Sequence, residues 1–105
     1  MDAGTYDFSS PLVRSTSASH GTYHFIVVPA AIGEVLDGVA LMRRLESGRR
    51  AGFGSVRLTL RIGATRWLTS AFPFKAHGWS ILVSAKVRKA ERLVAGEPVE
   101  ATIAL

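Results

Sequence analysis

Apolar and polar residues alternate most clearly over residues 55–62. Four apolar side chains occupy every second position there: Val56, Leu58, Leu60 and Ile62. This period is typical of a strand with one face in a core and the other in water. Gly63-Ala64 follows at once and fits a two-residue type II′ turn, which prefers glycine at its first position. We therefore predict a β-hairpin whose return strand covers residues 65–72.

Four further strands are predicted from alternation and from their content of β-branched and aromatic residues. They cover residues 6–13, 23–28, 79–83 and 99–105. Polar or glycine-containing segments separate the elements and are predicted to be loops. These loops are residues 15–21, 47–54 and 73–78. The chain thus has the pattern of a mostly β protein with about six strands.

Two helices are predicted between the strands. The first runs from about Ala30 towards Leu45, where apolar residues recur near helical spacing and Pro29 suits the first turn. Gly33 and Gly38 weaken this helix. The second begins at the cap residue Ser84 and ends at Leu93.

Length and composition limit the class of protein. The 105 residues suit one domain, residues 1–105, which can bury a core without covalent cross-links. The chain has no cysteine, which excludes disulfides, thiolate zinc sites, iron–sulfur clusters and a cysteine nucleophile. The N-terminus does not read as a secretory signal, and the longest apolar run, residues 25–32, is too short to span a bilayer. We expect a cytoplasmic monomer or homodimer without membrane contact.

Five segments carry a family resemblance: Phe53-Gly54-Ser55-Val56, Ile62-Gly63, residues 67–73, residues 83–91 and residues 96–99. Together they resemble a bacterial family, domain of unknown function 1905. The likeness covers about residues 6–105, and Gly96-Glu97 stands where the family usually has Gly-Asp. The resemblance implies a double-split β-barrel with two short helices, a fold shared with AbrB-like and MazE-like swapped-hairpin regulators. It implies no catalytic residue, because no activity is established for the family.

Positive charge is concentrated in the second half of the chain. The formal net charge is +5, and residues 43–92 hold twelve Arg or Lys against two acids. The other residues hold one Arg and six acids. Such asymmetry indicates either a polyanionic partner or a solvated basic face.

The hairpin places three arginines on one face. With Gly63-Ala64 as the turn, Arg61 faces Arg66, and Arg57 faces Ser70. Like charges directly opposite one another are unfavourable, so this pair needs an anion, a carboxylate or open water. A phosphate or carboxylate ligand is one interpretation, since arginine binds such groups bidentately. Pairing with Glu97 or Glu100, or simple exposure, is the other.

Five further residues are candidates for contact with a ligand. Thr69 and Ser70 lie where a strand reaches the predicted barrel rim, a usual place for pockets. Trp79 follows a loop and is a candidate for stacking on a ligand, although burial in the core is the stronger expectation, as it is for Trp67. Further bases are Lys75 and Arg88, the latter on a helix face that is otherwise expected to be solvated.

No familiar catalytic motif is present. The chain lacks G-x-S-x-G, H-E-x-x-H, a Walker lysine and a calcium loop. His20, His24 and His77 have no metal-ligand spacing, and His24 reads as a structural residue. We therefore expect neither a metal nor a cofactor.

Three functions stay open. The favoured one is a binding module for a small anionic ligand, phosphate or carboxylate. The second is nucleic-acid binding through the basic surface, with easy phosphate contacts but poor base reading, because the chain has no Asn or Gln. The third is a small barrel enzyme without a recognisable motif, which a concave pocket holding a perturbed acid or base would favour.

Overall fold

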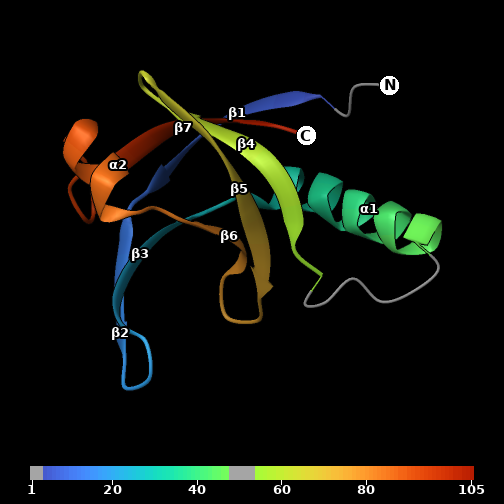
Figure 1. Ribbon diagram of the computed structural model, residues 1–105, viewed down its shortest axis with the longest axis horizontal. Helices are drawn as coiled ribbons and strands as arrows, with labels where there is room; N and C mark the ends of the chain where they lie inside the picture. Colours follow the sequence, from blue (N-terminus) through green and yellow to red (C-terminus); the bar gives the residue numbers. More distant parts are fainter. Residues whose placement is uncertain (1–3, 48–53) are drawn as a thin grey trace.

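The computed structural model describes residues 4–47 and 54–105 (Figure 1). Their strands and helices follow in the order β1 (Thr5–Pro11), β2 (Val13–Ser17), β3 (Gly21–Val27), α1 (Ala30–Ser47), β4 (Val56–Ile62), β5 (Thr65–Phe74), β6 (Gly78–Leu82), α2 (Ala85–Ala90) and β7 (Pro98–Ala104). Most of the predicted loop over residues 47–54 lies outside the described residues.

The seven strands within the described residues form one antiparallel sheet in the order β1-β7-β4-β5-β6-β3-β2. The two edge strands, β1 and β2, are separated only by Leu12, so one bent segment of chain supplies both edges. At the bend, the Leu12 N–H donates to the Glu97 carbonyl at 3.0 Å, and the Gly96 N–H donates to the Leu12 carbonyl at 2.8 Å. The sheet therefore curls into a half-barrel, as Figure 1 shows. The predicted class, a mostly β barrel-like fold, is confirmed.

The local pattern missed one bend and misplaced two strand boundaries. The predicted strand over residues 6–13 is divided at Leu12 into β1 and β2, so the described residues form seven strands rather than about six. The predicted loop over residues 15–21 is wrong in its first part, because β2 continues to Ser17. Its serines and threonines pair with β3, and the Thr16 and Thr22 hydroxyls lie 3.2 Å apart. Strand β5 likewise continues through Pro73 to Phe74, where a loop was predicted. In both places cross-strand pairing outweighs the local preference for a turn.

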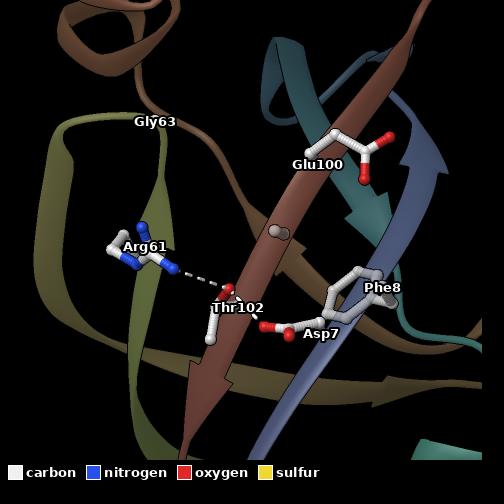
Figure 2. A pocket seen from close by; sticks show the side chains of 7 residues that line it. Asp7, Phe8, Arg61, Gly63, Glu100 and Thr102 are labelled. Carbon is white, nitrogen blue, oxygen red and sulfur yellow. Dashed lines mark hydrogen bonds between the residues drawn. The ribbon is translucent and has the colours of Figure 1, made fainter.

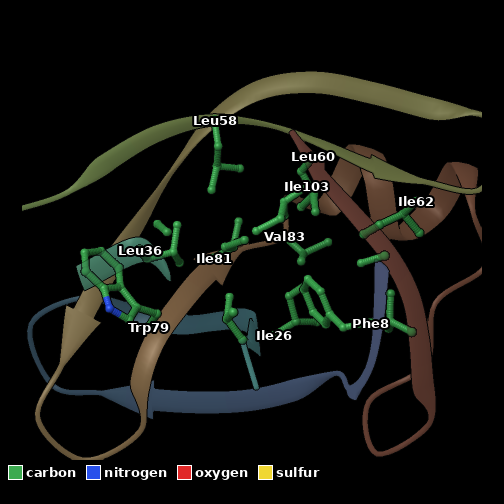
Figure 3. Packing of buried hydrophobic residues seen from close by; sticks show 14 of the residues in the cluster. Phe8, Ile26, Leu36, Leu58, Leu60, Ile62, Trp79, Ile81, Val83 and Ile103 are labelled. Atoms are coloured by element: carbon green, nitrogen blue, oxygen red, sulfur yellow. The ribbon is translucent and has the colours of Figure 1, made fainter. Parts of the chain in front are cut away.

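The core fills the concave side of the sheet and is closed by α1 (Figure 3). The four alternating apolar residues of β4 are all buried, as predicted. Helix α1 contributes the fully buried Leu36 and is unbroken despite its two glycines. A Cβ at Gly33 would lie 3.3 Å from a ring carbon of Trp79, so the glycine lets this helix approach the indole closely. None of the described helices is both long enough and apolar enough to cross a bilayer.

Helix α2 is shorter than predicted. Ser84 caps it, because its hydroxyl accepts from the Val87 N–H at 3.4 Å. The helix ends at Ala90 rather than Leu93, since Arg92 adopts a left-handed φ of 54°. The Leu93 N–H then donates back to the Arg88 carbonyl at 2.9 Å, which is the Schellman pattern of a helix C-terminus.

Candidate functional site

The hairpin of β4 and β5 has the predicted turn and register. Gly63 has a φ of 59° and Ala64 is not in the positive-φ region, as a type II′ turn requires. Arg61 pairs with Arg66, and both side chains are exposed. They occupy the first pair beyond the one that closes the turn, a non-hydrogen-bonded pair in which Cα atoms approach to about 4.5 Å. Both arginine side chains therefore project from the same, convex face.

Neighbouring strands extend this pair into a row. Thr102 of β7 lies opposite Arg61, and Asp7 of β1 lies opposite Thr102. An Arg61 terminal nitrogen donates to the Thr102 hydroxyl at 3.3 Å, and that hydroxyl donates to an Asp7 carboxylate oxygen at 2.6 Å (Figure 2). The carboxylate of Asp7 thus reaches Arg61 only through a neutral hydroxyl.

The two glutamates considered from the sequence do not neutralise the arginine pair. In Figure 2 the Glu100 carboxylate points away from Arg61, on the other side of β7. The Glu97 carbonyl accepts a hydrogen bond from the Leu12 N–H at the bend between β1 and β2. Within residues 4–47 and 54–105, neither Arg61 nor Arg66 forms a salt bridge.

Two surface hollows flank Arg61 and differ in charge. The first has a volume of about 400 Å³ and includes the carboxylates of Asp7 and Glu100 in its lining, which Figure 2 shows. The second has a volume of about 420 Å³ and is lined by Thr5, Thr59, Arg61, Arg66, Thr102 and Ala104. This second hollow, hereafter the arginine–threonine hollow, combines two guanidinium groups and three hydroxyls without a carboxylate. Its lining can therefore donate hydrogen bonds to an anion from several directions.

The structure separates the other predicted ligand-binding residues. Arg57 and Ser70 face each other on the same convex face, but neither lines the arginine–threonine hollow. Lys75 is exposed in the turn between β5 and β6. Trp79 is only 7% exposed and lies in the core, where its indole N–H donates to Asp37 at 2.8 Å.

Thr69 and Arg88 line a different hollow of about 420 Å³, between β3, β5 and the start of α2. Its lining residues are Thr22, Tyr23, His24, Trp67, Thr69, Leu82, Val83, Ser84 and Arg88, and it is hereafter the His24–Arg88 hollow. Trp67, expected in the core, is instead half-buried and forms part of this wall. The eight candidate residues therefore do not form one site.

Sequence reasoning missed the threonines of the arginine–threonine hollow. Thr59 and Thr102 alternate with apolar residues, so their outward direction is readable from the pattern. Their meeting depends on β7 pairing with both β4 and β1, which the pattern does not reveal. Among the described residues, no three His, Asp or Glu side chains are grouped closely enough to hold a metal ion.

Comparison with known sequences identifies the family of the chain. A search of curated proteins finds no match to the chain. The sequence model described as "Domain of unknown function (DUF1905)" matches residues 8–103, which is nearly the whole chain. The chain therefore belongs to the DUF1905 family.

Proposed function

We propose that this protein is a binding module for a small anionic ligand of the phosphate or carboxylate class, held in the arginine–threonine hollow. The observation that carries the proposal is the cross-strand pair of Arg61 and Arg66, which lacks a carboxylate partner in the described part of the chain. Such a pair is unfavourable in the free protein by about 0.2–1 kcal/mol. A bound anion would convert this repulsion into two attractions, because each guanidinium can present a planar fork of donors.

The position of the hollow favours a small ligand over a long one. On the β7 side of Arg61 the surface carries Asp7 and Glu100, so the positive region is narrow there. The hydroxyls of Thr5 and Thr59 lie beside the arginines and can donate to the oxygens of one phosphate or carboxylate group, whereas the Thr102 hydroxyl already donates to Asp7. A duplex would place many phosphates along the surface and would meet these acids.

Nucleic-acid binding stays a prediction for the basic surface as a whole. A fold shared with AbrB-like and MazE-like regulators, which the family resemblance implies, belongs to that alternative, although fold is a poor guide to function. The enzyme alternative has one supporting observation. Burial, followed by the charges of Arg88 and Arg14, lowers the pKa of His24, which lines a hollow. The lining of that hollow, however, contains no carboxylic acid to act with it.

The test is calorimetric titration with inorganic phosphate and with citrate at low ionic strength. Arg61→Ala and Arg66→Ala should each weaken binding about tenfold or more, because a hydrogen bond to a charged group contributes about 1.5–3 kcal/mol. Arg57→Ala is the matched control, since it removes the same charge from the same face of β4 without touching the hollow. Its affinity should stay within about twofold of the wild type.

Equal losses in all three variants would overturn the proposal, because they would report diffuse charge rather than a site. A DNA duplex titrated in parallel identifies the alternative. Tight, steeply salt-dependent duplex binding together with equal losses would assign the basic surface to nucleic acid.

A further inference from the structure

The His24–Arg88 hollow contains a cation, Arg88, that no acid among the described residues neutralises. Arg88 is half-buried, and the hydrogen bond seen for its guanidinium runs from a terminal nitrogen to the Nε2 atom of His24, at 3.3 Å. Within the described residues Arg88 forms no salt bridge. Partial burial of a charge without a counter-charge costs free energy. The arrangement therefore does not contribute to stability in the way that a paired arginine would.

The hydrogen bond assigns the protonation state of His24. An arginine can only donate, so Nε2 of His24 must accept and carry no proton. The pKa of His24 is lowered by burial, and further by the positive charges of Arg88 from α2 and Arg14 from β2, which favours the neutral ring. The proton of the neutral ring then lies on Nδ1.

Two donors of this pair have no partner. The Nδ1 atom of His24 and the Nε atom of Arg88 are both covered and make no hydrogen bond. Leaving a buried donor unpaired costs about 1–3 kcal/mol. Because both atoms are covered, the group that a ligand in the hollow can pair with is the positive charge of the half-buried Arg88, which the described residues leave uncompensated.

The other lining residues of the His24–Arg88 hollow indicate what kind of ligand would fit it. Trp67 and Tyr23 contribute aromatic rings, and Thr69 contributes a hydroxyl. Trp67 is half-buried although it pairs with the fully buried Leu60, because it stands at the hollow rather than beneath another element. Aromatic surface next to a cation suits a flat apolar molecule that carries one acidic group.

We propose that the His24–Arg88 hollow is a second binding site, for a small carboxylic acid with a planar apolar body. The carboxylate would pair with the guanidinium of Arg88, and the planar body would lie against Trp67. This site is independent of the arginine–threonine hollow, since the two share no lining residue.

The first experiment uses the wild-type protein and benzoate as the probe. The His24 ring is followed by NMR during a pH titration, with and without millimolar benzoate. A carboxylate beside Arg88 cancels part of the positive field, so the pKa of His24 should rise on addition of benzoate. An unchanged His24 titration would overturn the proposal. Inorganic phosphate, which lacks the planar body, should shift this ring less than benzoate does.

The second experiment compares variants by Trp67 fluorescence in a Trp79→Phe background. Arg88→Gln should weaken benzoate binding about tenfold or more. Lys89→Gln is the matched control, because it removes the same charge from the next residue of α2, which is exposed and outside the hollow. Equal weakening in both variants would overturn the site. The readout is Trp67, which lines this hollow and not the arginine–threonine hollow, so this result is separate from the fate of the proposed phosphate site.

Discussion

The repulsion between Arg61 and Arg66 gives a stability test that needs no ligand. Arg66→Glu places a carboxylate directly opposite Arg61, at the same position of the same non-hydrogen-bonded pair. The substitution removes an unfavourable pair and creates a favourable one, each with a magnitude of about 0.2–1 kcal/mol. The expected gain in the free energy of unfolding is therefore about 0.5–2 kcal/mol at low salt. Both side chains are exposed, so no loss of packing should offset it.

Arg57→Glu is the control for the change in net charge. It lies on the same face of β4, but it faces the neutral Ser70, so it has no directly opposed like charge; the nearby Arg43 guanidinium bonds to its backbone carbonyl. Thermal unfolding of both variants at low salt, about 10 mM, and at about 1 M salt measures the difference. For a domain of this size, about 1 kcal/mol corresponds to a Tm shift of about 4 °C. The advantage of Arg66→Glu over Arg57→Glu should largely disappear at the higher salt concentration, where the Debye length is about 3 Å.

The result also bears on the ligand. If phosphate occupies the arginine–threonine hollow of the folded state, it should raise the Tm of the wild type and should not raise that of Arg66→Glu. If Arg66→Glu is no more stable than Arg57→Glu at low salt, the two guanidinium groups do not repel each other. The argument for an anion between them would then be refuted.

Three further predictions concern the stability of elements next to the two hollows. Gly63→Ala should lower the free energy of unfolding by about 1–2 kcal/mol in urea denaturation, because residue 63 has a left-handed φ and its new Cβ would collide with the Glu91 carboxylate; an unchanged midpoint would contradict the turn geometry. Arg92→Gly should raise it by about 1 kcal/mol, since glycine adopts the required φ without strain; a loss of stability would refute this. The folded-state pKa of His24 lies below its usual value of 6.5. The neutral His24 ring therefore makes its full contribution to the free energy of unfolding above pH 6.5, and this contribution is lost as pH falls below that value. Unfolding measured from about pH 8 to about pH 5 should show this loss, and His24→Phe should flatten the profile; equal slopes in both proteins would exclude His24 as the cause.

Elements that depend on neighbours in sequence were predictable. The hairpin register follows from a two-residue turn, which leaves one way to pair the strands, so the local sequence is enough to predict Arg61 opposite Arg66. The start of α1 after Pro29 and the cap at Ser84 are likewise local effects. In each case the residues that decide the conformation lie within a few positions of one another.

Tertiary structure alone decided which residues surround the arginines. Thr102 bonds to Arg61 across 41 positions of the chain and to Asp7 across 95. These contacts exist because β7 pairs with β1 on one side and β4 on the other, and no local pattern specifies that order. The pairing of β6 with β3 and β5 brings Thr69 and Arg88 to a separate hollow from Arg61. Alternation shows which face of a strand a side chain occupies, but long-range pairing selects its neighbours, and a binding site is defined by neighbours.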